Sequence, residues 1–150
     1  MDWGPNTESD TKAFVKHAIT YETSRPRTHY ELAITLKETG ELIGGCGIEK
    51  RVARKEGVIG YCLNKAYWDR GYGTEATRAL IEFGFARLAL HRIFALCDPS
   101  NIGSNRVLEK AGMTLEGHLR EDFPVKGKWH DTMIYAILEC EWSSEKRVRP

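Results

Sequence analysis

Apolar and polar residues alternate along most of the first half of the chain, after one amphipathic segment. The segment from about Ser9 to Thr23 predicts a helix, because Ser9 or Asp10 can cap it and Phe14, Ala18 and Ile19 recur at helical spacing. Beyond the break at residues 24–27, every second residue is apolar, which predicts strands with one buried face. The expected strands lie at residues 30–36, 42–49 and 58–63, with a hairpin turn at 38–41 and a charged loop at 51–57.

After Gly73 the apolar residues no longer alternate with polar ones but recur every three to four residues, as in a helix. The residues expected on the buried face of this helix are Ala76, Ala79, Leu80, Phe83 and Arg87. The elements expected in this half are a helix at 74–90, a strand at 91–97, a helix at 101–111, strands at 113–120 and 132–142, and a frayed charged tail after 143. The order α-β-β-β-α-β-α-β-β predicts an α+β fold with a mixed sheet and at least one parallel crossover.

Length and charge narrow the classes of protein. A chain of 150 residues without a linker or repeat predicts a single domain over residues 1–150. Its formal net charge of +1 argues against a protein dedicated to nucleic acid, which would be far more basic. No apolar run approaches the roughly 20 residues that span a bilayer, and the first residues do not resemble a secretory signal. We therefore expect a cytoplasmic protein that is not integral to a membrane.

The four cysteines predict neither a metal site nor a disulfide framework. They form no CxxC pair, and no two histidines stand at metal-ligand spacing on one helix. Each cysteine lies in an apolar, strand-like stretch, so we expect buried, reduced thiols at Cys46, Cys62, Cys97 and Cys140.

The segment Trp68–Thr74 is the strongest candidate for chemistry, because it joins a predicted strand to a predicted helix through two glycines. Glycines allow backbone N–H groups to turn towards a ligand, and a helix start adds unpaired N–H donors and a positive dipole end. Such a turn suits a phosphate or pyrophosphate. A tight turn that needs glycine only for its backbone angles is an equal alternative on this evidence.

Two nucleotide-binding hypotheses follow from this turn. Residues 71–76 fit the G-x-G-x-x-A pattern of dinucleotide-binding proteins, and Asp98 ends the next strand. That pattern should open a series of βαβ units, whereas here it follows antiparallel strands. A phosphate-binding P-loop is excluded, because G-x-x-x-x-G-K-[ST] is absent. The second hypothesis is binding of an acyl-coenzyme A.

The sequence resembles a known family at these positions. Val58–Leu63 followed by Tyr67–Ala76 looks like the acetyl-CoA-binding signature of GNAT acetyltransferases. Asn101–Met113 resembles the N-x-x-S…EK-x-GF segment of the RimJ/RimL-like branch, and Trp129-His130-Asp131 is similar to that branch too. The resemblance covers residues 3–142. It implies a central, mostly antiparallel mixed sheet flanked by helices, with two strands splayed into a V for acetyl-CoA.

Two features depart from the general family pattern. The family's loop usually opens with Gln or Arg, whereas this chain has Trp68, an aromatic that is common in the RimJ/RimL-like branch. Family members also usually begin with a strand and a helix before the helix expected at Ser9. We expect these two elements to be missing from this sequence.

The resemblance also assigns roles in binding acetyl-CoA. It implies that Arg70, Gly71, Tyr72, Gly73 and Thr74 hold the pyrophosphate, largely through backbone N–H groups. The pantetheine arm would lie along the strand that ends at Cys62 and Leu63, where a backbone N–H could stabilise the oxyanion. One such donor is worth about 3 kcal/mol. Asn101 would contact the pantetheine, although a helix N-cap is as good an explanation of Asn101 and could coexist with that contact.

The sequence identifies the catalytic residues less clearly than the residues expected to bind acetyl-CoA. By resemblance, Ser104 donates a hydrogen bond to the departing thiolate, the alternative being a simple hydrogen bond within its helix. Asp131, Glu49 and His118 are candidates to take the proton of the amine, and we favour Asp131. The plain alternative for His130-Asp131 is a turn with a solvent-exposed ion pair.

The expected function is transfer of the acetyl group of acetyl-CoA to a primary amine, either a protein N-terminus or a small molecule, with homodimerisation as a possibility. The alternatives are a non-catalytic acyl-CoA-binding module and a dinucleotide-binding protein. Gly73→Glu is predicted to abolish CoA binding while leaving the fold intact.

Overall fold

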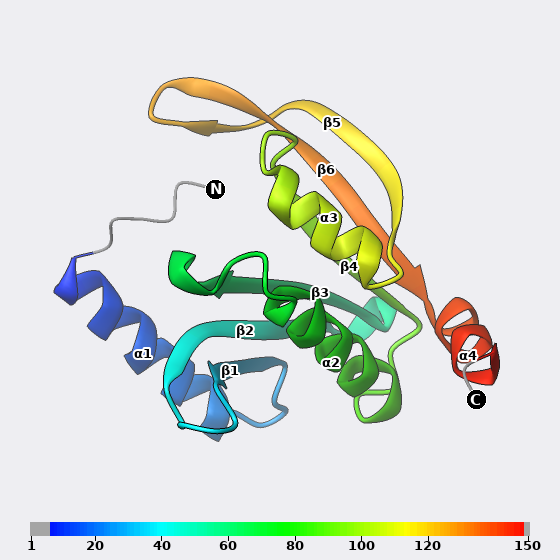
Figure 1. The fold of residues 1–150 in the computed structure, drawn as a ribbon, viewed down its shortest axis with the longest axis horizontal. Coiled ribbons are helices and arrows are strands. Elements are labelled where there is room, and N and C mark those ends of the chain that lie inside the picture. The colour runs from blue at the N-terminus through cyan, green and yellow to red at the C-terminus, as the bar shows by residue number, and fades with distance from the viewer. Residues whose placement is uncertain (1–6, 149–150) are drawn as a thin grey trace.

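Figure 1 shows the computed structural model, which describes residues 7–148, with side chains up to Ser143. The helices are α1 (Glu8–Thr23), α2 (Tyr72–Ala86), α3 (Ile102–Lys110) and α4 (Glu139–Val148), with short 3-10 turns η1 (Val52–Arg54) and η2 (Lys65–Tyr67). The strands are β1 (His29–Thr35), β2 (Leu42–Arg51), β3 (Glu56–Leu63), β4 (Arg92–Cys97), β5 (Thr114–Val125) and β6 (Lys128–Leu138). None of the described helices has the length and apolar character that a membrane crossing requires.

The six strands form one sheet in the order β1-β2-β3-β4-β6-β5. All neighbours are antiparallel except β3 and β4, which pair in parallel at three positions only, from Glu56–Arg92 to Val58–Phe94. Beyond Val58 the two strands separate, since β3 continues to Leu63 and β4 to Cys97 without pairing to each other. Figure 1 shows the resulting V. The predicted α+β fold with a mostly antiparallel, splayed sheet is therefore confirmed. That residues 1–150 form a single domain stays a prediction.

The helices lie on opposite faces of the sheet. The ring of Tyr21 in α1 stacks on His29 of β1 with centroids 4.3 Å apart. The next residue of the same strand, Tyr30, contacts Phe83 of α2 at 5.1 Å. Consecutive residues of a strand point to opposite faces, so α1 covers one face and α2 the other. Helix α3 lies on the side of α2, because Val107 reaches the first turn of α2 at Gly73.

The main core lies between α2 and the sheet, on a helix face that matches the predicted one in part, since Leu80 is buried and Ala76 and Phe83 pack against the core. Ala79 and Arg87 are exposed. The buried residues of α2 are Gly73, Thr77, Leu80, Ile81, Gly84 and Phe85. The apolar pattern did not indicate Gly73 and Gly84, because glycine carries no hydrophobic signal, although both bring the helix close to its neighbours. A Cβ on Gly84 would lie 2.6 Å from Cδ1 of Ile93.

Several predicted boundaries are wrong, mostly at chain reversals. Helix α2 ends at Ala86 rather than Leu90, and the chain turns back through Ala89 at φ +51°. Strand β3 begins at Glu56, inside the expected charged loop, and β5 extends to Val125 rather than ending at 120. Strand β6 ends at Leu138. Helix α4 replaces the expected end of that strand and the frayed tail, and its Trp142 packs against Phe85 at 5.4 Å.

The four cysteines are reduced thiols, as expected, but only two of them are buried. Cys46 and Cys97 belong to the core, whereas Cys62 and Cys140 are exposed. Cys140 lies on α4 rather than in a strand. Cys62 is exposed because it belongs to the part of β3 that has left β4.

Gly44 fixes how closely β2 approaches the end of β3, where it pairs with Leu63. A Cβ at this position would lie 2.2 Å from the carbonyl oxygen of Cys62, which is backbone and cannot rotate away. We expect Gly44→Ala to lower the free energy of unfolding by about 1–3 kcal/mol, as overpacking does. Urea denaturation measures this. The matched control is Gly60→Ala, where a Cβ meets nothing within 4 Å. Equal stability of the two variants would contradict the close approach.

Candidate functional site

The facing edges of β3 and β4 are open where the V widens. The pairing between them ends at Val58, so the edge of β3 from Ile59 to Leu63 has no strand partner on the side of β4. Backbone N–H and C=O groups at such an edge can pair with an extended ligand. Cys62 and Leu63, both predicted to contact a cofactor, lie on this edge. The Leu63 carbonyl accepts a hydrogen bond of 2.9 Å from the indole Nε1 of Trp68, which ties the following turn to the strand end.

The chain then turns sharply into α2 and leaves the start of that helix uncapped. Asp69 and Gly71 adopt left-handed backbone angles, at φ +57° and +85°. Gly71 is the N-cap and provides no side-chain hydrogen bond, while the first intrahelical bond runs from Glu75 N to Gly71 O. The N–H groups of residues 72–74 therefore have no acceptor within the helix. Together with the positive end of the helix dipole, these N–H groups suit an anion directly after the open strand edge.

Arg70 adds a positive side chain to this turn. Its guanidinium carbon lies 5.7 Å from the centroid of the Tyr67 ring. The Tyr67 hydroxyl in turn donates a 2.6 Å hydrogen bond to Glu41 in the loop between β1 and β2. The Trp68 side chain is 55% exposed at the rim of the same turn. The predicted loop residues thus converge on one patch that suits a phosphate.

Gly73 differs from its neighbours because it faces the protein interior. It is buried, and a Cβ there would lie 3.3 Å from Val107, 3.4 Å from Tyr61 and 3.5 Å from Leu63. A glutamate at this position would be forced into a packed junction of α2, β3 and α3. The prediction that Gly73→Glu leaves the fold intact does not agree with this geometry, so the variant would not isolate an effect on binding.

Asn101 and Ser104 stand at the start of α3, just beyond the end of β4. The Asn101 side-chain oxygen accepts a 3.0 Å hydrogen bond from Ser104 N, so Asn101 is the N-cap of α3. Its amide NH₂ has no hydrogen-bond partner among residues 7–143 and is available to a ligand. The two explanations of Asn101 can therefore hold together.

Tyr61 is a residue that the sequence analysis did not single out. Its hydroxyl lies 3.0 Å from the Ser104 hydroxyl, across the mouth of the V from β3 to α3. Burial raises the pKa of Tyr61, and a hydrogen bond with Ser104 offsets part of that rise. Burial also raises the pKa of the Cys97 thiol, whose surroundings include Ser104. Strand alternation could have placed Tyr61 on the same face as Leu63, but nothing local predicts its contact with Ser104.

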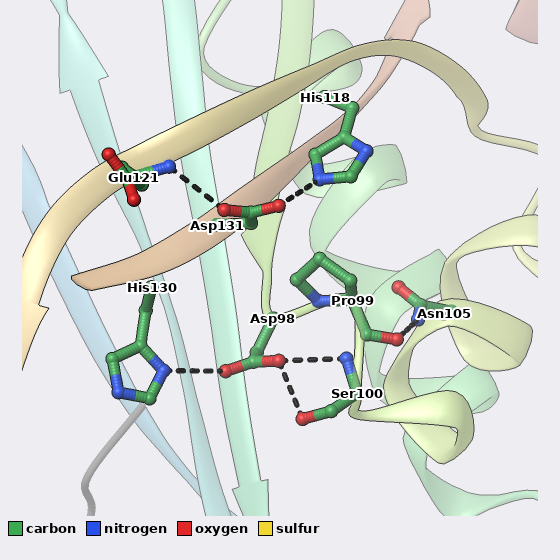
Figure 2. A network of polar contacts seen from close by, with 8 residues as sticks. All are labelled: Asp98, Pro99, Ser100, Asn105, His118, Glu121, His130 and Asp131. Carbon is green, nitrogen blue, oxygen red and sulfur yellow. Dashed lines mark hydrogen bonds and ion pairs between the residues drawn. The ribbon is translucent and has the colours of Figure 1, made fainter. Parts of the chain in front are cut away.

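Asp131 and His118, two of the three candidate bases, contact each other on the hairpin of β5 and β6 (Figure 2). His118 Nε2 lies 2.7 Å from Asp131 Oδ2, and Glu121 N donates a 2.8 Å hydrogen bond to Oδ1. The bond from Glu121, and then that from His118, lower the pKa of Asp131. The register of β5 shifts between Leu119 and Phe123, and Glu121 is at φ +49°. Asp131 therefore holds a bulge in β5.

A recess of about 860 Å³ follows this bulge. The residues that line it are His118, Leu119, Arg120, Glu121, Asp122 and Asp131. The strand register links the recess to the V, since His118 is opposite Met133, and Met133 is opposite Cys97. His118 thus stands two strands from Cys97, about 10 Å across the sheet.

Glu49 and His130 are placed differently. Glu49 is opposite Val58, at the closed end of the V, and lies 3.7 Å from His29 Nε2. His130 contacts Asp98 at 3.5 Å rather than forming an ion pair with Asp131 (Figure 2). Hydrogen bonds from the Ser100 hydroxyl and N–H, at 2.6 and 2.7 Å, lower the pKa of Asp98. Of the three candidate bases, only His118 and Asp131 lie on the arm of the V that carries Cys97.

Comparison with known proteins matches this arrangement to one family. Residues 1–114 match the acetyltransferase (GNAT) domain. The chain belongs to the GNAT acetyltransferase family. It is 37% identical over 140 residues to the uncharacterised N-acetyltransferase YnaD of Bacillus subtilis (strain 168), covering 93% of this chain and 79% of YnaD.

Solved GNAT structures have the same fold. A GNAT acetyltransferase of Bacillus anthracis is 34% identical with a TM-score of 0.79, covering 91% of this chain and 77% of that one. RimJ of Mycobacterium smegmatis, solved with a CoA disulfide, is 27% identical with a TM-score of 0.78, covering 89% of this chain and 63% of its own. The chain thus spans between 63% and 79% of the length of these three proteins.

These matches confirm the prediction of an acetyltransferase of the GNAT family with RimJ/RimL-like relatives. They also argue against the dinucleotide-binding alternative, which needs a series of parallel βαβ units. In this GNAT sheet only β3 and β4 are parallel, and only over three positions.

The lowered pKa of Asp131 predicts an acid-dependent loss of stability. The unfolded chain takes up this proton near the ordinary pKa of 3.8, whereas the folded protein does so at lower pH. The stabilisation is therefore complete above 3.8 and lost as the pH falls through the lowered value. In Asp131→Asn we expect a weaker dependence of the unfolding free energy on pH between about 5 and 2. Urea denaturation at a series of pH values measures it, with Asp122→Asn as the matched control. Identical pH dependence in the wild type and Asp131→Asn would refute the assignment.

Proposed function

We propose that this protein transfers the acetyl group of acetyl-CoA to a primary amine by direct attack in a ternary complex. One observation carries the proposal: β3 leaves β4 after Val58 and is followed at once by a turn into an uncapped helix. An open strand edge next to an anion site matches a ligand with an extended, amide-bearing arm attached to a pyrophosphate.

The residues present fit acetyl-CoA, which would supply the acetyl group as an activated thioester. The N–H groups of Tyr72, Gly73 and Thr74 and the guanidinium of Arg70 would hold the pyrophosphate. The backbone at Cys62 and Leu63 would pair with the pantetheine arm, with the Asn101 amide as a further contact. Holding the thioester beside the amine is the main requirement of the reaction.

Ser104 is proposed to assist departure of the sulfur. It stands at the mouth of the V, half-buried, with its hydroxyl near Tyr61 and Cys97. A hydrogen bond from Ser104 stabilises the negative charge that forms on the sulfur as it leaves. The thiol of free CoA resembles an ordinary thiol, with a pKa near 8.5, so its thiolate is already a fair leaving group. The expected gain in rate from the hydrogen bond is therefore moderate.

The His118–Asp131 pair is proposed to take the proton that the attacking ammonium must lose. The carboxylate of Asp131 already accepts two hydrogen bonds, which makes it a weak base. Its role in this proposal is to hold the imidazole through Nε2, which leaves Nδ1 of His118 as the acceptor. The recess along β5 would admit the amine.

The names of two relatives point to different acceptors, and the higher identity favours a ribosomal acceptor over a polyamine. The putative ribosomal N-acetyltransferase YdaF of Bacillus subtilis is 35% identical over 92 residues. The spermidine N(1)-acetyltransferase of Escherichia coli is 22% identical over 86 residues. A cytoplasmic location and a homodimer remain predictions with this proposal.

Acetyl-CoA binding can be measured directly by calorimetric titration of the purified chain, with NAD titrated in parallel. We expect micromolar binding of acetyl-CoA and no response to NAD. A panel of peptides with free N-termini and of small amines should then show acetylation by mass spectrometry. Binding without transfer to any amine would favour a non-catalytic acyl-CoA-binding module, and absence of acetyl-CoA binding by the folded protein would refute the proposal.

Ser104→Ala tests the proposed hydrogen-bond donor. We expect kcat to fall roughly 10- to 100-fold, which is at or below the lower end of the range for general acids, because the sulfur leaves without a hydrogen-bond donor. The dissociation constant of acetyl-CoA should stay within about twofold, since Ser104 is not part of the pyrophosphate turn. The control is Ser100→Ala, whose hydroxyl bonds Asp98 instead of Tyr61. An unchanged kcat in Ser104→Ala would exclude the role.

A further inference from the structure

We propose that Tyr61 is a positioning residue for the reaction: its hydroxyl donates to Ser104 and thereby aims the single Ser104 hydrogen at the sulfur of bound acetyl-CoA. This inference rests on the function proposed above and on the contact between two hydroxyls from β3 and α3, 3.0 Å apart across the mouth of the V.

The role of Tyr61 follows from the number of hydrogens that the Ser104 hydroxyl can donate. A serine hydroxyl has one hydrogen and two acceptor lone pairs. If Ser104 donates its hydrogen to Tyr61, it cannot donate a hydrogen bond to the sulfur. If Tyr61 donates instead, the Ser104 hydrogen is free and its oxygen is held in place by the bond it accepts. Burial raises the pKa of Tyr61, so the phenol keeps its proton at neutral pH and can serve as this donor.

The surroundings of Tyr61 keep its ring in one position. Cε2 of the ring lies 3.4 Å from where a Cβ of Gly73 would be, and Val107 of α3 meets the same point at 3.3 Å. Val107 is one helical turn beyond Ser104. The ring therefore sits at the junction of the pyrophosphate turn, the open strand edge and the helix that carries Ser104. A hydroxyl on a fixed ring can hold its partner's orientation, which a mobile side chain cannot do.

A double-mutant cycle tests whether Tyr61 acts through Ser104. The variants are Tyr61→Phe, Ser104→Ala and the two combined, since phenylalanine keeps the packing at Gly73 and removes only the hydroxyl. The readout is the single-turnover rate with acetyl-CoA bound and the amine that the panel shows to react fastest. We expect Tyr61→Phe to slow transfer about three- to tenfold, with acetyl-CoA affinity within twofold, and to have no further effect in the Ser104→Ala background.

The matched control is Tyr135→Phe. Tyr135 is buried where Tyr61 is half-buried, and its hydroxyl donates to Glu109 of α3 at 3.3 Å rather than to Ser104. If Tyr61→Phe acted only by loosening the core, Tyr135→Phe would slow transfer similarly and the cycle would be additive. Either result would overturn the proposal. Thermal unfolding of each variant measures any loss of stability separately.

A second measurement needs no acceptor. In protein labelled with ¹³Cζ-tyrosine, the Tyr61 resonance should shift when CoA is added, and the Tyr61 titration should change in Ser104→Ala because the phenol loses its hydrogen-bond partner. An unchanged Tyr61 titration in Ser104→Ala would overturn the inference even with acetyl-CoA bound. Failure of acetyl-CoA to bind would instead count against the proposed function, so the two failures are distinguishable.

Discussion

The structure depends on the separation of β3 from β4. Each strand keeps its antiparallel partner to the end, β3 with β2 as far as Leu63 and β4 with β6 as far as Cys97. The two strands share only three parallel positions with each other. The sheet is thus two antiparallel ribbons joined along a short seam, and the seam leaves backbone groups free on both arms. Unpaired backbone inside a folded protein is costly unless solvent or a ligand satisfies it.

The separation also decides where the two important helix starts lie. Helix α2 begins nine residues after β3 ends, and α3 begins five residues after β4 ends. The first turns of both helices therefore lie at the open end of the V. Gly73 allows α2 to approach β3 and α3 closely, so the pyrophosphate turn, the strand edge and Ser104 share one packed junction. The start of α2 that is proposed to hold the pyrophosphate therefore packs against α3, which carries Ser104.

Local sequence signals predicted the parts of the site that neighbouring residues build. The glycine turn after β3, the N-cap at Asn101 and the alternating strands are all properties of a few consecutive residues. The contact between Tyr61 and Ser104 spans 43 residues, and that between His118 and Asp131 depends on the register of β5 with β6. A bulge in β5 changes that register, and no local pattern of apolar residues predicts it. The buried face of α2 was predicted only in part, because two of its members are glycines, which carry no hydrophobic signal.

The bulge places a limit on the chemistry of Asp131. The two hydrogen bonds that hold the bulge are made to its charged form, so they stabilise the carboxylate and weaken it as a base. The same bonds hold His118 in one orientation on the arm of the V that ends at Cys97. In the proposed mechanism, Asp131 is therefore better suited to orient His118 than to take the proton of the amine itself. Ser104 is in the corresponding situation on the other side of the reaction, since its usefulness as a donor depends on a partner that supplies it with a hydrogen bond. In the proposed mechanism, Asp131 and Ser104 therefore each depend on a partner from another strand, His118 on β5 and Tyr61 on β3.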